Sequence, residues 1–259
     1  MPSELRTGRH DRTLVLTLTD PDTRNALSEE ITTAGVEALG VAESSDDICC
    51  VVINGADGNF SSGGNLDQLE RHSQLGPDVQ TARLNRLHQW KVAIRSFPKP
   101  VIAAVEGAAA GAGCSLALSC DLVVAARDAR FVLSYNRIGL SPDAGCTWHL
   151  MQALPRQFAT QWIWLSQPMP AEQLHVHGLV NRVTDNGQAL TEALALAQQL
   201  SELAPNALAS SKELLNNWPT HSLPQQLDCE RDSFVDNLLH PNAAEGIAAF
   251  RAKRAPRFG

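Results

Sequence analysis

The stretch PKPVIAAVEGAAAGAGCSLALSCDLVVAA, residues 98–126, contains two apolar runs separated by a glycine-rich turn and a short helical pattern. The runs VIAAVEG (101–107) and DLVVAAR (121–127) are typical of buried strands, and residues 112–119 are predicted to form a helix between them. Gly107, Gly111 and Gly113 let the backbone approach a ligand closely, and the start of a helix favours negative charge. The turn is therefore a candidate hydrogen-bond donor to an oxyanion. A purely structural tight turn is the alternative.

The same alternation extends in both directions along the chain. Further strands are expected at 12–20, 48–56, 130–134 and 178–183, and further helices at about 28–43, 77–96 and 156–166. This pattern predicts the α/β class. From about residue 187 the strand signals stop, and helical patterns separated by prolines follow. We expect a core over residues 1–196 and a helical region over residues 197–259 that packs on a neighbouring copy.

Composition and charge exclude several classes of function. The chain has 259 residues, 44% hydrophobic residues and a formal net charge of -7, which predicts a folded protein without a nucleic-acid-binding surface. The polar start MPSELRTGRHDR is unlike a signal peptide, and no apolar run is long enough to cross a bilayer. We therefore expect a cytoplasmic protein with no membrane partner. The six cysteines lack metal-ligand spacing, so we expect reduced packing residues and no metal site.

A second glycine-rich turn, NFSSGGNLDQL (59–69), follows the strand expected at 48–56. It joins a series that also contains DPDTRNALS (20–28), the stretch at 98–126, GLSPDAGCTWHL (139–150), GLVNRV (178–183) and FRAKRAPRF (250–258). In content and order this series resembles the crotonase superfamily, that is, the enoyl-CoA hydratase/isomerase family. The resemblance implies a crotonase-type spiral of ββα units with the acyl-CoA site in residues 1–196, and a C-terminal helical trimerisation region. It also implies a homotrimer or a dimer of trimers.

The resemblance gives both glycine-rich turns a role. In the family, two backbone N–H groups bind the thioester oxygen of an acyl-CoA, and by motif position they belong here to Gly64 and Ala112. Such donors stabilise an enolate by roughly 3 kcal/mol each. No cofactor is implied beyond the coenzyme A of the substrate. Arg24, Lys253 and Arg254 are candidates for binding the CoA phosphates. The substrate-binding residues expected from these segments are Arg24, Ala26, Phe60, Ser62, Asn65, Leu66, Tyr135, Leu140, Trp148 and Lys253.

The catalytic acid is the point at which the chain departs from the family's hydratases. Those enzymes carry two glutamates at positions that hold Ser115 and Tyr135 here, and neither residue can act as a carboxylate. Asp143, in LSPDAGCTWHL (140–150), is the acid that remains on the segment expected to face the substrate. This context resembles the branch that contains ring-1,2-epoxyphenylacetyl-CoA isomerase and Δ3,Δ2-enoyl-CoA isomerases. One carboxylate suffices for an isomerase, because it takes a proton from one carbon and returns it to another.

Several alternatives remain open. Hydration by a non-standard residue set is one, and a non-catalytic acyl-CoA-binding paralogue without the glutamates is another. His88, Tyr135 and Asp143 also fall near the positions of a histidine, a tryptophan and a nucleophilic aspartate in 4-chlorobenzoyl-CoA dehalogenase, another crotonase. On its own, Asp143 also suits the N-cap of a helix that begins near residue 144. The favoured expectation is an isomerase in which Asp143 is the acid and base.

Overall fold

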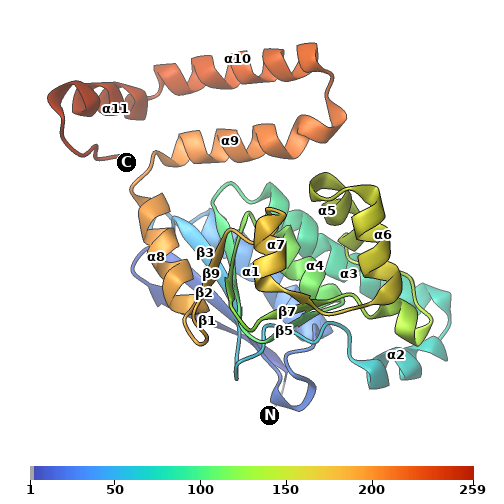
Figure 1. The fold of residues 1–259 in the computed structure, drawn as a ribbon. Helices are drawn as coiled ribbons and strands as arrows, with labels where there is room; N and C mark the ends of the chain where they lie inside the picture. The colour runs from blue at the N-terminus through green and yellow to red at the C-terminus, as the bar shows by residue number, and fades with distance from the viewer. Residues whose placement is uncertain (1–2) are drawn as a thin grey trace.

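A six-stranded sheet with the order β1-β2-β3-β4-β6-β9 forms the centre of the computed structural model, which describes residues 3–259 (Figure 1). β1 runs antiparallel to β2, and all other neighbours in this sheet are parallel. Three short strands form a second sheet with the order β5-β7-β8. The strands are β1 Glu4–His10, β2 Thr13–Thr19, β3 Cys50–Gly55, β4 Val101–Val105, β5 Ala108–Ala110, β6 Leu122–Ala126, β7 Arg130–Val132, β8 Met169–Pro170 and β9 Arg182–Thr184.

The helices cover the sheet and continue beyond it. They are α1 Glu29–Glu43, α2 Leu66–Ser73, α3 Pro77–Ser96, α4 Ala112–Ser119, α5 Cys146–Ala153, α6 Arg156–Leu165, α7 Ala171–Val176, α8 Ala189–Ser201, α9 Pro205–Asn217, α10 Leu223–Leu239 and α11 Pro241–Ala252. The α/β class and the helices expected at 28–43, 77–96, 112–119 and 156–166 are confirmed. Within residues 3–259, no helix combines the length and the apolar character that a membrane span requires.

The central strands are buried on both faces, which explains why their sequences are continuous apolar runs. Val52 and Ile102 point to one side and pack with Leu196 of α8. Ile53 and Val105, at alternate positions, belong to the main core on the other side of the sheet. The sheet is therefore a rigid layer, and the loops that follow its parallel strands are held at defined positions.

The strand predictions need correction, because β1, β5 and β8 were not expected and one expected strand is shifted. β1 was not expected, because its side chains are polar and mostly exposed; it is an edge strand joined to β2 through Asp11, whose φ is +50°. The strand expected at 178–183 is shifted, and β9 covers only Arg182–Thr184. Gly178 lies before it in a left-handed turn with φ +77°, and Val180 is buried without being part of the ladder.

The C-terminal region separates from the core after α8. The boundary expected between residues 196 and 197 lies inside α8, which packs on the sheet, so the change in packing comes later, at the start of α9. α9, α10 and α11 extend away from the sheet, and the C-terminus lies near the start of α9 (Figure 1). Lys212 of α9 fastens this extension to the core: its Nζ donates to Asp121 Oδ2 at 2.7 Å and to the backbone oxygen of Ile94 at 3.0 Å.

Candidate active site

A cavity of about 830 Å³ lies where the loops after β2 and β3 meet the start of α4. Gly64 and Ala112 line it, and so does Asp143 from the loop before α5. The three residues to which the sequence assigns catalytic roles therefore share one cavity. Helices α2 and α3 form the opposite wall and contribute both leucine side chains, including Leu69 and Leu84, and polar or charged side chains, including Arg83.

Backbone pairing brings the two glycine-rich turns together. The N–H of Ser61 donates to the carbonyl oxygen of Ala108 at 2.9 Å, and the N–H of Ala110 donates to the carbonyl oxygen of Ser61 at 2.8 Å. The turn after β3 thus runs alongside β5, which leads directly into α4. Gly64 lies three residues after the paired Ser61, and Ala112 lies two residues after Ala110. This pairing places their backbones on adjacent edges of the cavity.

The N–H groups of Gly64 and Ala112 are available to a ligand. Among residues 3–259, neither group has a hydrogen-bond acceptor. Ala112 is the first residue of α4, so its N–H points out of the helix start, where the helix dipole favours negative charge. All eight residues of α4 are buried, which keeps water away from this side of the donors. The pair is suited to hold an oxyanion in a site of low dielectric.

Asp143 is held by Tyr135. The phenolic hydroxyl of Tyr135 donates to Oδ1 of Asp143 at 2.7 Å. Burial, reinforced by the charge of Asp143, raises the pKa of Tyr135 far above its ordinary value, so the phenol keeps its proton and remains a donor. Ser115 is fully buried, and its Oγ lies 3.5 Å from the carbonyl oxygen of Asp143. The two residues that the sequence comparison of motifs expects in place of the hydratases' glutamates are thus a phenol bonded to a carboxylate and a buried hydroxyl.

Lys91 of α3 is a buried cation behind the oxyanion donors, and the sequence prediction missed it. Its Nζ donates to the carbonyl oxygen of Ala112 at 3.3 Å, and burial lowers its pKa to about 7. His149 of α5 lies on the same side, with Nε2 at 3.3 Å from Ser119 Oγ. Burial, together with the nearby positive charge of Lys91, lowers the pKa of His149 to about 4, so it is neutral at pH 7. Both side chains contact α4, and neither lines the cavity.

Arg83 of α3 is the second functional candidate that the sequence prediction missed. It lines the cavity. Burial lowers the pKa of its guanidinium, and the negative charges of Asp143 and Glu29 partly offset that decrease. In the sequence, both Arg83 and Lys91 look like ordinary solvated cations of an amphipathic helix. Helix periodicity alone would have placed Lys91 on the buried face, because it is next to Trp90 and three residues before Ile94.

The expected substrate-binding residues divide into two groups. Ser62, Asn65, Leu66, Tyr135 and Leu140 line the cavity. Asn65 also caps α2, because its side chain accepts a hydrogen bond from the N–H of Gln68 at 3.0 Å.

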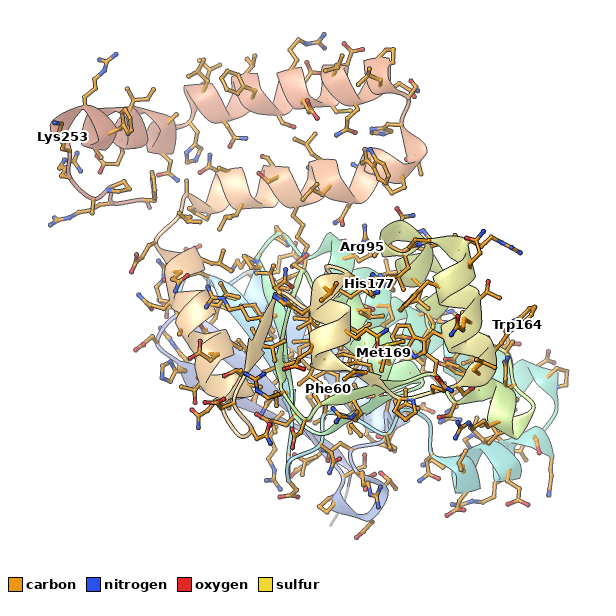
Figure 2. The ribbon with its side chains drawn as sticks, in the orientation of Figure 1. Phe60, Arg95, Trp164, Met169, His177 and Lys253 are labelled. Atoms are coloured by element: carbon orange, nitrogen blue, oxygen red, sulfur yellow. The ribbon has the colours of Figure 1, made fainter. Side chains whose placement is uncertain are left out.

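Five expected residues lie elsewhere in this chain. Phe60 is wholly buried in the main core, and Ala26 is buried in a bridge to Gly63, so neither lines the cavity (Figure 2). Trp148 is also outside it: α5 turns its ring outward, under the guanidinium of Arg95, which is 4.4 Å from the ring centroid. Arg24 is exposed beside the cavity. Lys253 lies at the end of α11, far from the sheet (Figure 2).

His88 is exposed on α3 and does not line the cavity, so it does not approach Asp143 within this chain. The described residues, 3–259, contain no group of three or more His, Cys, Asp or Glu side chains that could hold a metal ion. All six cysteines are free, and four of them are buried. The cavity lining combines the Asp143 carboxylate, the Tyr135 phenol and the N–H groups of Gly64 and Ala112 with further charged side chains, namely Asp22, Glu29, Asp67, Arg83 and Arg86.

Comparison with known proteins identifies the family to which this chain belongs. Residues 9–259 match the family described as enoyl-CoA hydratase/isomerase. The chain belongs to this family. It is similar to the 1,2-epoxyphenylacetyl-CoA isomerase of Escherichia coli strain K12, with 36% identity over 95% of this chain and 94% of the relative. It is also similar to the 2,3-dehydroadipyl-CoA hydratase of the same strain, with 35% identity over 99% of this chain and 98% of the relative.

The fold of this enoyl-CoA hydratase/isomerase family member is shared with solved structures. A crystal structure of an enoyl-CoA hydratase from Polaromonas sp. JS666 superposes with a TM-score of 0.98 and 52% identity, covering 99% of this chain and 100% of that one. The crotonase fold expected from the sequence is confirmed. One of these relatives is named as an isomerase and another as a hydratase. Membership of the family therefore establishes acyl-CoA chemistry but does not distinguish isomerisation from hydration.

Proposed function

We propose that this protein is an acyl-CoA isomerase that moves a double bond, or rearranges a ring, next to a thioester. Gly64 and Ala112 would bind the thioester oxygen, and Asp143 would carry the proton. The observation that supports this most strongly is the hydrogen bond of 2.7 Å from Tyr135 to Asp143 inside the cavity that both donors line. A phenol occupies one glutamate position of the family's hydratases and orients the single carboxylate beside the donors.

The proposed reaction of a 3-enoyl thioester has two proton transfers. The free oxygen of the Asp143 carboxylate takes a proton from C2, and the electron pair of that C–H bond moves into the thioester to form a dienolate. The negative charge on the thioester oxygen is stabilised by the N–H groups of Gly64 and Ala112. Asp143 then returns the proton to C4, which leaves the double bond between C2 and C3. No water and no redox step are required, and Tyr135 keeps the carboxylate in place between the transfers.

Hydration is the second candidate. Two observations favour it: one relative is named as a 2,3-dehydroadipyl-CoA hydratase, and Tyr135 and Asp143 form a polar pair that can hold a water molecule. A dehalogenase-like reaction has less support, because His88 is exposed and outside the cavity.

The proposal retains the remaining expectations from the sequence. The substrate is a CoA thioester, and no other cofactor takes part. The assembly is a homotrimer or a dimer of trimers in the cytoplasm. Because Lys253 lies far from the cavity of its own chain, the expectation that it contacts CoA requires that it reach the site of a neighbouring copy (Figure 2). Arg24, exposed beside the cavity, would contact the same CoA from within the chain.

Product identity tests the proposal. The purified protein is incubated with trans-2-, cis-3- and trans-3-enoyl-CoAs and with 4-chlorobenzoyl-CoA, and the products are separated and identified by mass spectrometry. We expect interconversion of the 3-enoyl and 2-enoyl thioesters without a change in composition. Addition of one water to the 2-enoyl thioester as the main reaction would favour hydration instead. Binding without any turnover would support a non-catalytic acyl-CoA-binding protein.

A further inference from the structure

The cavity contains a positive charge that the proposed proton transfers do not use. Arg83 of α3 lines the cavity and is partly buried there. Its Nη2 donates one hydrogen bond, to Oε1 of Gln68 at 3.4 Å. No carboxylate of residues 3–259 lies within ion-pair distance of this guanidinium. The loss of surrounding water lowers the pKa of Arg83, as expected for a cation that lacks a close anionic partner.

The acids near Arg83 already have partners. Asp143 accepts the hydrogen bond from Tyr135, and Glu29 forms an ion pair with Arg86, Nη1 to Oε1, at 2.8 Å. Arg86 is thus neutralised within the protein, in contrast to Arg83. A guanidinium has five N–H donors, and Arg83 uses one of them, on a neutral amide. The remaining donors form a planar fork, whose geometry matches a carboxylate.

Arg83 belongs to the acyl part of the cavity. Its guanidinium is close enough to Asp143 for the two charges to interact, and Asp143 lines the same cavity as the oxyanion donors. Leu69, Leu84 and Leu87 supply apolar lining that suits a methylene chain. A chain that ended in a methyl group would remove water from Arg83 without replacing its hydrogen bonds, which is unfavourable. A chain that ended in an anion would replace them.

We infer that Arg83 binds a carboxylate at the far end of the acyl chain, so that the preferred substrates are CoA thioesters of dicarboxylic acids. The inference rests on the proposed function, because it assigns a substrate class to the same acyl-CoA site. Arg83 then acts as the specificity-determining residue, and the distance from the thioester oxygen to the guanidinium selects the chain length. Its interaction with the substrate is electrostatic and involves no bond change.

Calorimetric titration with saturated thioesters tests this without any turnover. The ligands are succinyl-, glutaryl- and adipyl-CoA, each paired with the methyl-ended thioester of equal carbon number, and free CoA. The proteins are the wild type, Arg83→Met, Arg83→Lys, and Arg71→Gln as a matched control on the exposed side of α2 outside the cavity lining. We expect the wild type to bind at least one dicarboxylic thioester about tenfold more tightly than its partner, as one charged hydrogen-bonded pair provides.

The variants separate the possible outcomes. Arg83→Met should abolish the preference, Arg83→Lys should retain part of it, and Arg71→Gln should retain all of it. Equal binding of both ligand types by the wild type would overturn the inference while leaving the proposed function intact. An equal loss of affinity for free CoA in Arg83→Met would also overturn it, because Arg83 would then bind the CoA phosphates. Failure of the wild type to bind any thioester would contradict the proposed function itself, and the inference with it.

Discussion

Tyr135 acts on the reaction through Asp143. The change Tyr135→Phe removes the hydroxyl that donates to Asp143 Oδ1 at 2.7 Å and leaves the ring in place. A hydrogen bond to a charged group contributes about 1.5–3 kcal/mol, so we expect kcat to fall by roughly ten- to a hundredfold. KM should change little, because the hydroxyl orients the carboxylate and the donors still bind the thioester. Steady-state kinetics with a 3-enoyl-CoA measures both. An unchanged kcat in Tyr135→Phe would contradict this role, because it would show that the hydroxyl does not orient Asp143 for catalysis.

Lys91 makes the stability of the protein depend on pH. Its folded-state pKa of about 7 is below the 10.5 of an exposed lysine, so the unfolded chain binds more protons between these values, and stability rises with pH there. The charged form of Lys91 is therefore a cost that is largest below pH 7. Lys91→Met should raise the free energy of unfolding more at pH 6 than at pH 9, by about 3 kcal/mol. Urea unfolding at both pH values measures this difference. An equal change in the free energy of unfolding at pH 6 and pH 9 would show that the pKa of Lys91 is not lowered in the folded protein.

At the scale of elements, the position of the oxyanion donors depends on the turn after β3. Gly63 adopts φ +86°, and a Cβ there would lie 2.4 Å from the carbonyl oxygen of Ala110 and 3.0 Å from the nitrogen of Ala112. Gly63→Ala must push the turn away from the start of α4. We expect a loss of about a hundredfold in kcat, the effect of losing one oxyanion donor. Gly40→Ala on α1, where a Cβ meets nothing within 4 Å, is the matched control for kinetics and thermal unfolding.

Some of the strands and helices could be predicted from the sequence and others could not. The buried strands and the helix at 112–119 could be predicted because β4 and α4 are buried on all sides and consist mainly of apolar residues. β1 could not be predicted, because the sequence of this solvent-facing edge strand does not alternate between apolar and polar residues. Asp143 was found from its motif. Lys91 was missed because a lysine in an amphipathic helix is ordinarily solvated, although its spacing from Leu87 and Ile94 puts it on the buried face of α3.

At the scale of the whole molecule, the C-terminal helices expose apolar side chains that a monomer would be expected to bury. Trp218, Phe234 and Leu239 are more than half exposed, and Phe250 of α11 is 85% exposed. A surface of this kind is typical of a subunit interface, which supports the homotrimer or dimer of trimers proposed above from the family resemblance. Light scattering after size exclusion should give three or six chain masses. Phe234→Asp should lower that number, and it should weaken acyl-CoA binding if Lys253 serves a neighbouring site. A monomeric wild type would contradict this account of the region.

The central claim is that Asp143 carries a proton to and from a thioester enolate. The most direct measurement follows a 3-enoyl-CoA in deuterated water by mass spectrometry, with wild type, Asp143→Asn, and Asp128→Asn as an acid outside the cavity lining. We predict a 2-enoyl product that contains solvent deuterium with the wild type and Asp128→Asn. With Asp143→Asn the rate should fall by about 100- to 10,000-fold, the usual contribution of a general acid and base, while calorimetry still detects the bound thioester. Deuterated isomer formed by Asp143→Asn at the wild-type rate would contradict the claim.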